Sequence, residues 1–189
     1  EVRNCLMIMT NKDFYEFVIK LDSVDSFRNC LPISDRRTDE QYRLELLLRL
    51  LIPSYIDWSR INQYSDFAEL LDKETISLCN KELVFETIEE RFTATFNLLY
   101  GVFDENAFKK YNGTKYVGPV MASAFQAIAV GVYQNVEQIL ALEKTNEWLV
   151  SKVHAFYSED AFVKNTTPGV RSIPRFKDMS LFGTEYFKP

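Results

Sequence analysis

The chain has 189 residues, of which 22 are Lys or Arg and 27 are Asp or Glu, so its formal net charge is −5. Hydrophobic residues make up 47% and charged residues 26%, a balance that excludes a disordered tail, a collagen-like fibre and a disulfide-stapled miniprotein. A chain of this length buries roughly 70% of its unfolded surface in one substantial core. The 6 Gly and 6 Pro favour helices with short connections over a β-sandwich or barrel.

The first part of the chain predicts several amphipathic helices. Apolar residues recur at helical spacing over 11–31, which indicates two helices, the first of them capped by Asn11. A capping-box pattern over 38–41 predicts a helix that runs to Pro53. The sequence Asp-x-x-Glu at 66–69 opens a further, shorter helix.

The clearest helical signal is an apolar stripe between about residues 82 and 103. The stripe comprises Val84, Phe85, Ile88, Phe92, Phe96, Leu99 and Phe103. A loop is expected over 112–118, and the most apolar helix is expected to follow, with Pro119 in its first turn and its end at Asn135. Alanines and Gly131 in this helix let neighbouring helices approach closely, so we expect it at the centre of the molecule.

The remaining residues predict a helix over 148–156, a break at 166–169 and a final helical stretch over 176–187. No internal repeat, low-complexity run or linker divides the chain. The sequence therefore predicts an all-α fold, with residues 1–189 forming one multi-helix bundle of about seven to nine helices.

Cysteine and histidine are scarce, which restricts the chemistry open to the chain. Cys5, Cys30 and Cys79 are scattered without a CxxC pair, a pattern typical of reduced thiols rather than of disulfides or a zinc site. His154 is the only histidine, so neither a histidine metal cluster nor a pair of catalytic histidines can form. Its place on an expected helix favours a partly buried or surface residue over a base or a ligand. We expect no metal site.

The expected location is cytoplasmic, without contact with a membrane. No apolar run reaches the ~18 residues that a transmembrane helix needs. The longest run is interrupted by Ser123 and Gln126, and the N-terminus lacks the pattern of a signal peptide. Because the sequence begins with Glu1, we expect a piece of a longer protein.

The first group of candidate functional residues is an arginine cluster. Asp35, Arg36 and Arg37 precede the third predicted helix, which carries Glu45 and Arg49. The guanidinium of arginine donates two parallel hydrogen bonds to phosphate oxygens, and a helix N-terminus offers free backbone N–H groups that bind the same oxygens. The alternative is structural: Glu45 and Arg49 form an intrahelical pair of about 0.3–0.5 kcal/mol, and Asp35 pairs with one of the arginines. The residues alone favour this alternative.

A second group lies near the C-terminus, where residues 164–188 include five basic and two acidic residues. A glycine-containing loop with hydroxyls and arginines before a helix can cradle an anion. The candidates are Thr167, Gly169, Arg171, Ser172 and Arg175. The spacing is not that of a P-loop, and a surface turn with solvated charges is the favoured alternative.

Six stretches, taken in order, carry a family resemblance. They are SFRNCLPISDRR at 26–37, LELLLRLL at 44–51, SDFAELL at 65–71, FDENAF at 103–108, MASAFQAIAVGV at 121–132 and TPGVRSIPRF at 167–176. Together they resemble the C-terminal helical half of the GmrSD-type, ParB-like nuclease-related family of bacterial proteins. This family is associated with modification-dependent restriction and defence against phage.

The resemblance implies that the catalytic parts lie elsewhere. Family members carry a ParB-like N-terminal half with an Asp-Gly-Gln-Gln-Arg motif for nucleotide binding and hydrolysis, and many carry or partner with a His-Asn-His nuclease part. Neither motif occurs in this chain. The chain would thus have no catalytic residue and no cofactor of its own, within a parent NTP-dependent nuclease or subunit. Its implied partners are the nucleotide-binding half and DNA.

The resemblance also bears on the arginine cluster. Asp35, Arg36, Arg37, Glu45 and Arg49 match the family's arginine-rich turn and the helix that follows, although the gap between Arg37 and Glu45 is longer here. By analogy these arginines either contact a phosphate held by the other half or dock the two halves, and both roles stay open. The alternative function is a protein-interaction module that binds a partner or a second copy through an exposed apolar face.

Overall fold

The computed structural model describes residues 2–33 and 41–189. Its helices are α1 (Val2–Thr10), α2 (Lys12–Asp22), α3 (Asp25–Asn29), α5 (Tyr42–Leu51), α6 (Phe67–Cys79), α7 (Phe85–Phe103), α8 (Ala122–Leu140), α9 (Thr145–Phe156), α10 (Asp160–Thr166) and α11 (Ser172–Tyr186). Short 3₁₀ helices occupy Ile52–Ser54, Trp58–Gln63 and Asp104–Asn106. Strands β1 (Lys110–Tyr111) and β2 (Tyr116–Val117) pair antiparallel. The prediction of an all-α fold is confirmed.

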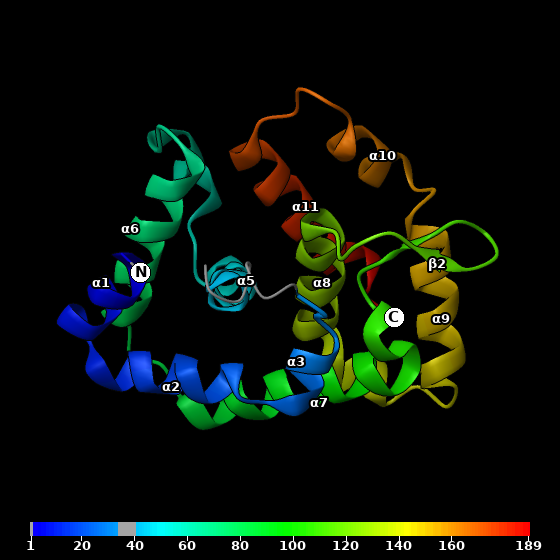
Figure 1. Ribbon diagram of the computed structural model, residues 1–189, viewed down its shortest axis with the longest axis horizontal. Helices are drawn as coiled ribbons and strands as arrows, with labels where there is room; N and C mark the ends of the chain where they lie inside the picture. The colour runs from blue at the N-terminus through cyan, green and yellow to red at the C-terminus, as the bar shows by residue number, and fades with distance from the viewer. Residues whose placement is uncertain (1, 34–40) are drawn as a thin grey trace.

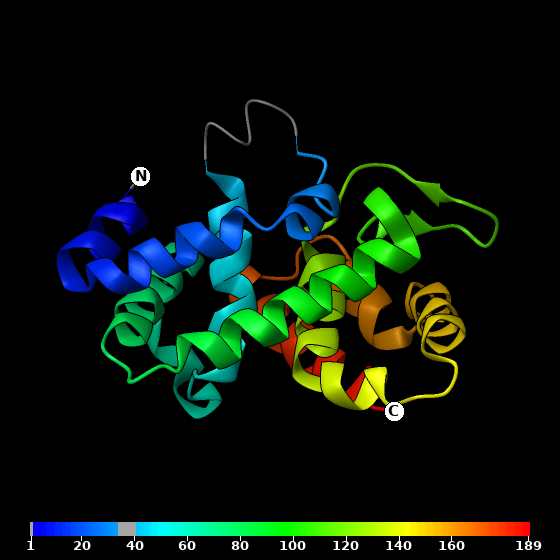
Figure 2. The same cartoon turned by 90° about the horizontal axis from the view of Figure 1, so that it is seen from below.

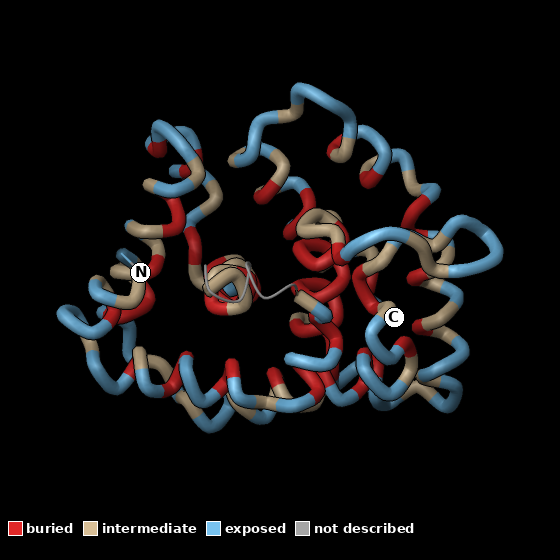
Figure 3. Tube along the Cα trace, in the orientation of Figure 1, coloured by how far each residue is buried: buried red, intermediate tan, exposed pale blue. Residues whose placement is uncertain are grey.

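The helices surround α8, as predicted. Figure 1 shows α5 and α8 in the middle, with α2, α3 and α7 along one side and α9 beside the β-hairpin at one end. Seen from below in Figure 2, α7 runs obliquely across the middle of the molecule. Nearly every residue of α8 from Ala124 to Val136 is buried, and the tube in Figure 3 shows this central burial.

The most extensive helix pair is α8 with α11, and two glycines make it possible. A Cβ on Gly131 would collide with the backbone of Gly183, and a Cβ on Gly183 would collide with the backbone of Ala127. The two backbones therefore touch directly, which is the close approach that the sequence predicted for Gly131.

Two predicted N-caps are confirmed. The Phe14 N–H donates to Asn11 Oδ1 at 3.0 Å, and the Glu69 N–H donates to Asp66 Oδ1 at 2.9 Å. The Glu69 carboxylate in turn accepts from the Ser65 N–H at 2.6 Å. These local contacts start α2 and α6 where the sequence indicated.

The third predicted helix differs at its beginning. The capping-box residue Thr38 lies outside the described residues, and the described helix, α5, begins at Tyr42. Gln41 precedes it with a left-handed φ of 55°, so the helix does not extend back through this residue. The Gln41 side-chain oxygen accepts a hydrogen bond from Asn4 of α1, a contact between distant segments that the local pattern did not indicate.

The start of α8 was also predicted wrongly. Pro119 lies outside the helix, which begins at Ala122 and continues beyond Asn135 to Leu140. The Met121 N–H donates to the Phe108 carbonyl at 2.9 Å, and this tertiary hydrogen bond holds Met121 in an extended conformation.

Other differences concern short or exposed segments. Helices α1 and α10 were not predicted, and the expected loop 112–118 overlaps a small hairpin. In the apolar stripe Val84 is exposed, because it precedes α7 as its N-cap residue.

Candidate functional site

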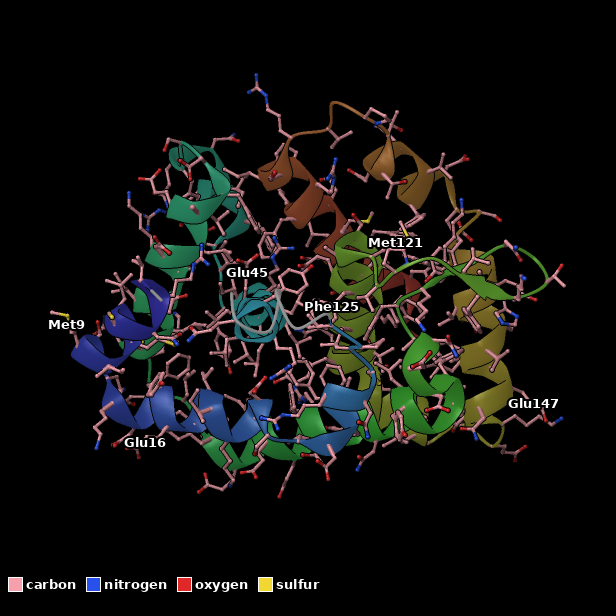
Figure 4. All side chains as sticks on the ribbon, in the orientation of Figure 1. Met9, Glu16, Glu45, Met121, Phe125 and Glu147 are labelled. Atoms are coloured by element: carbon pink, nitrogen blue, oxygen red, sulfur yellow. The ribbon has the colours of Figure 1, made fainter. Side chains whose placement is uncertain are left out.

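A small polar cavity of about 140 Å³ lies where α5, α6, α8 and α11 meet. Its lining residues are Arg49, Phe67, Ala122, Ser123, Gln126, Ser172, Arg175, Phe176 and Met179. In Figure 4 Glu45 marks α5, and Met121 marks the beginning of α8. The cavity thus brings Arg49 of the first candidate group together with Ser172 and Arg175 of the second.

Arg49 enters the cavity from α5 in a largely buried position. Its Nη2 donates to Glu45 Oε1 at 3.0 Å, so the predicted intrahelical pair is confirmed. Its guanidinium carbon lies 4.5 Å from the centre of the Phe67 ring, a cation–π distance. Burial lowers the pKa of Arg49, and Glu45 opposes that shift. Arg49 Nε is buried without a hydrogen-bond partner among the described residues.

Glu45 ties Arg49 to the N-terminal helix. Arg3 of α1 donates to Glu45 at 3.1 Å and lies 2.8 Å from Asp72 Oδ1 of α6. Two arginines and two carboxylates therefore form a balanced network behind the cavity. Glu45 orients Arg49 and does not line the cavity.

Arg175 differs because no described carboxylate lies within ion-pair distance of it. Its Nε donates to the Asn165 carbonyl at 2.9 Å, and its Nη2 donates to the Val170 carbonyl at 2.9 Å. These bonds fix the guanidinium and leave Nη1 for another acceptor. Arg175 therefore brings an uncompensated positive charge to the cavity.

Two helix N-termini open onto the same cavity. The N-cap residues of α8 and α11 are Met121 and Arg171, and neither side chain makes a capping hydrogen bond. Ala122, Ser123 and Ser172, from the first turns of these helices, line the cavity. Uncapped N–H groups and the positive ends of two helix dipoles favour an anion at this position.

Gln126 forms the floor of the site and is 3% exposed. Its Nε2 donates to the Arg49 carbonyl at 3.1 Å and to Ser180 Oγ at 2.9 Å. Because the Arg49 carbonyl can only accept, these bonds identify the amide nitrogen. Gln126 Oε1 is buried and has no hydrogen-bond partner in the described part of the chain. An unsatisfied buried acceptor costs about 1–3 kcal/mol.

The remaining C-terminal candidates lie outside the cavity. Thr167 Oγ1 donates to the Val163 carbonyl at 2.9 Å at the end of α10. Gly169 occupies an exposed turn with φ +92°, and Arg171 is exposed and faces a separate groove beside Trp58–Gln63. The loop therefore does not wrap an anion itself. Asp35, Arg36 and Arg37 lie outside the described residues.

Sequence reasoning missed Ser123, Gln126 and Phe67 as site residues. A signal for two of them is present, because Ser123 and Gln126 are the polar residues that interrupt the longest apolar run. A polar residue within a fully buried helix needs a partner, and the cavity is where these two are found.

The cavity offers binding groups rather than reactive groups. Its nine lining residues include two guanidiniums, two hydroxyls and one amide, and none of the nine is a carboxylate, a histidine or a thiol. Over 2–33 and 41–189 no three His, Cys, Asp or Glu residues are placed to hold a metal ion. In the same ranges no helix combines the length and apolarity needed to cross a membrane. Comparison of the chain with protein families, curated proteins and solved structures gave no match.

Proposed function

We propose that this chain is the helical, non-catalytic part of a GmrSD-like modification-dependent restriction or phage-defence protein. It packs against a nucleotide-binding or nuclease half and contacts phosphate through arginines. The observation that supports phosphate contact is the convergence of Arg49, Arg175 and the uncapped N-termini of α8 and α11 on one cavity. The guanidinium group of arginine and the backbone N–H groups at a helix N-terminus both donate hydrogen bonds to phosphate oxygens.

The contact is local, because the chain as a whole is acidic with a net charge of −5. Non-specific binding to DNA needs many lysines and arginines spread over one face of the protein. Other described arginines are engaged in packing: Arg28 and Arg43 both donate to Asp22, at 3.1 and 3.0 Å, and tie α3 and α5 to α2. Arg49 and Arg175 are therefore the arginines best placed to serve a ligand.

The family assignment has a test that does not involve the cavity. We expect the coding sequence directly upstream of the Glu1 codon, or an adjacent gene, to encode the Asp-Gly-Gln-Gln-Arg motif. The purified chain should hydrolyse neither NTP nor DNA on its own. Turnover in either assay that is lost in an Arg36→Ala or Arg175→Met variant would contradict the non-catalytic role.

The alternative, an interaction module with an exposed apolar face, has less support. The exposed large apolar side chains are scattered from α1 to α11 rather than gathered on one helix. Sedimentation of the purified chain at increasing concentration tests it. Self-association that persists at high salt would favour this alternative, since an apolar interface is not screened.

A further inference from the structure

We infer that a groove between α7, α8 and the 3₁₀ helix Ile52–Ser54 binds a carboxylate that carries a short aliphatic chain. The groove has a volume of about 270 Å³, and its lining residues are Ser54, Tyr55, Glu82, Leu83, Val84, Thr87, Ile88, Arg91 and Tyr133. None of these residues lines the cavity described above. The inference therefore goes beyond the proposed phosphate contact and does not depend on it.

Tyr133 of α8 is the buried polar residue of the groove. It is 2% exposed, and its hydroxyl has no hydrogen-bond partner over residues 2–33 and 41–189. Tyr133 Oη is not among the unpartnered polar atoms that are sealed from solvent in those ranges, so it keeps some accessible surface. Because Tyr133 lines the groove, that surface opens to it. A buried tyrosine hydroxyl usually has a hydrogen-bond partner, and a ligand in the groove would supply one.

Arg91 and Tyr55 lie beside this hydroxyl. The guanidinium carbon of Arg91 is 5.7 Å from the centre of the Tyr133 ring, and Tyr55 and Arg91 both act on the pKa of Tyr133. Burial raises the pKa of both tyrosines, so both phenols keep the proton that they can donate. Arg91 Nη2 donates to Glu137 at 3.3 Å, but Glu137 is 81% exposed, and a surface pair of this kind is weak. A guanidinium and two phenols thus offer hydrogen bonds at one place.

The charges of the groove favour a ligand with a single negative charge. Arg91 is its one basic residue, and Glu82, which is exposed, is its one acidic residue. A phosphate dianion would meet one cation only, and Glu82 would repel it. A carboxylate carries one charge, and its two oxygens match the planar guanidinium, with room for a phenol hydroxyl on either oxygen.

The rest of the groove is apolar, which suits an aliphatic chain beside the carboxylate. Leu83, Val84 and Ile88 line it, and Val84 is 63% exposed. Burying a ligand methylene against such side chains is favourable. The volume of about 270 Å³ is near the lower end of the roughly 300–1,000 Å³ of small-molecule sites. A short chain fits, and a large lipid does not.

The decisive experiment compares carboxylates with their uncharged amides. Isothermal titration calorimetry of the intact 189-residue chain at neutral pH would use hexanoate and hexanamide, and acetyl-alanyl-leucine and its C-terminal amide. A carboxylate should bind roughly tenfold more tightly than its amide, the value of a hydrogen bond to a charged group. Tighter binding of hexanoate identifies a free acid as the ligand, and tighter binding of the dipeptide identifies a peptide C-terminus. If neither carboxylate binds more tightly than its amide, the inference is overturned.

Two tyrosine variants test the role of the unpartnered hydroxyl. Tyr133→Phe should weaken carboxylate binding roughly tenfold. Tyr157→Phe removes a similarly buried hydroxyl outside the groove, which donates to the Lys109 carbonyl at 2.7 Å, and should leave the affinity within about twofold. Without ligand, the urea midpoint should fall in Tyr157→Phe and should not fall in Tyr133→Phe, which loses no internal hydrogen bond. A lower midpoint in Tyr133→Phe, or equal affinity losses in the two variants, overturns the inference.

A second pair of variants tests the charge. Arg91→Met should abolish the preference for carboxylate over amide, because it removes the cation of the groove. Glu137→Gln removes the carboxylate that competes for Arg91 and does not line the groove, so it should leave the affinity unchanged or raise it. A preference that survives in Arg91→Met overturns the assignment to this groove. Loss of binding in Glu137→Gln does the same, because it would show that the ion pair and not the groove is required.

Discussion

At the scale of single residues, His154 shows how packing sets a protonation state. Its Nε2 lies 3.0 Å from the Tyr116 hydroxyl, and its ring stacks on Tyr111 with centroids 3.7 Å apart. Burial lowers the pKa of His154. The folded chain therefore holds a neutral imidazole against the hairpin at pH values where the unfolded chain already binds a proton.

This shift gives a pH dependence of stability with a definite sign. The unfolded state binds the extra proton as pH falls through the ordinary value of about 6.5, so the free energy of unfolding should decrease below that pH until the folded pKa is passed. A His154→Gln variant should lose this slope, because the chain has no other histidine. Urea unfolding at a series of pH values measures it. An unchanged slope in the variant would show that another group is responsible.

Residue-level predictions succeeded where the contact is local in sequence. The caps by Asn11 and Asp66 and the pair between Glu45 and Arg49 join residues three or four positions apart, so residue type and spacing were sufficient. The cavity joins Arg49 to Arg175, and no spacing rule links positions that far apart. Their meeting depends on how α5 and α11 pack beside α8, which the sequence pattern does not contain.

At the scale of elements, the α8–α11 pair depends on two glycines. A side chain on Gly131 would meet the backbone of Gly183, and backbone cannot move aside as a flexible side chain can. The sequence indicated a close approach at Gly131, but not its partner. That partner follows only from the direction in which α11 crosses α8.

Alanine substitutions at two helical glycines should therefore have opposite effects. Gly131→Ala should destabilise the fold by about 3 kcal/mol or more, because overpacking here pushes two backbones apart. Gly101→Ala lies within α7 with no other atom within 4 Å of the added Cβ, and it should stabilise by about 0.5–1 kcal/mol through helix propensity. Urea unfolding of both variants measures the difference. Similar free energies of unfolding would mean that the helix pair is not packed as described.

The elements that were missed share a physical reason. Helix α1 has 9 residues and α10 has 7, so both are shorter than the window of about 11–18 residues over which helical periodicity is read. Both are held by tertiary contacts, of α1 with α2 and α6 and of α10 with α11. Periodicity detects a long amphipathic helix, and it misses a short helix whose stability depends on packing against its neighbours.

At the scale of the whole molecule, burial links all parts of the described chain. One connected cluster of buried apolar side chains includes Met7 of α1, Leu46 of α5, Phe125 of α8 and Phe187 beyond α11. The two tryptophans lie in different parts of this structure: Trp58 packs against Phe176, and Trp148 lies on α9. They are therefore suitable probes for the prediction that residues 1–189 form a single domain.

If one cooperative core holds the molecule, both probes must report the same transition. In Trp58→Phe the fluorescence of Trp148, and in Trp148→Phe the fluorescence of Trp58, should change at the same denaturant concentration as the far-ultraviolet circular dichroism of that variant. Separate midpoints would divide the chain into two units.

Because the cavity is walled by α5, α6, α8 and α11, bound phosphate should raise the midpoint in both variants together. A rise seen only at Trp58, the tryptophan that packs against the cavity residue Phe176, would mean that the ligand stabilises a local region and not the whole fold.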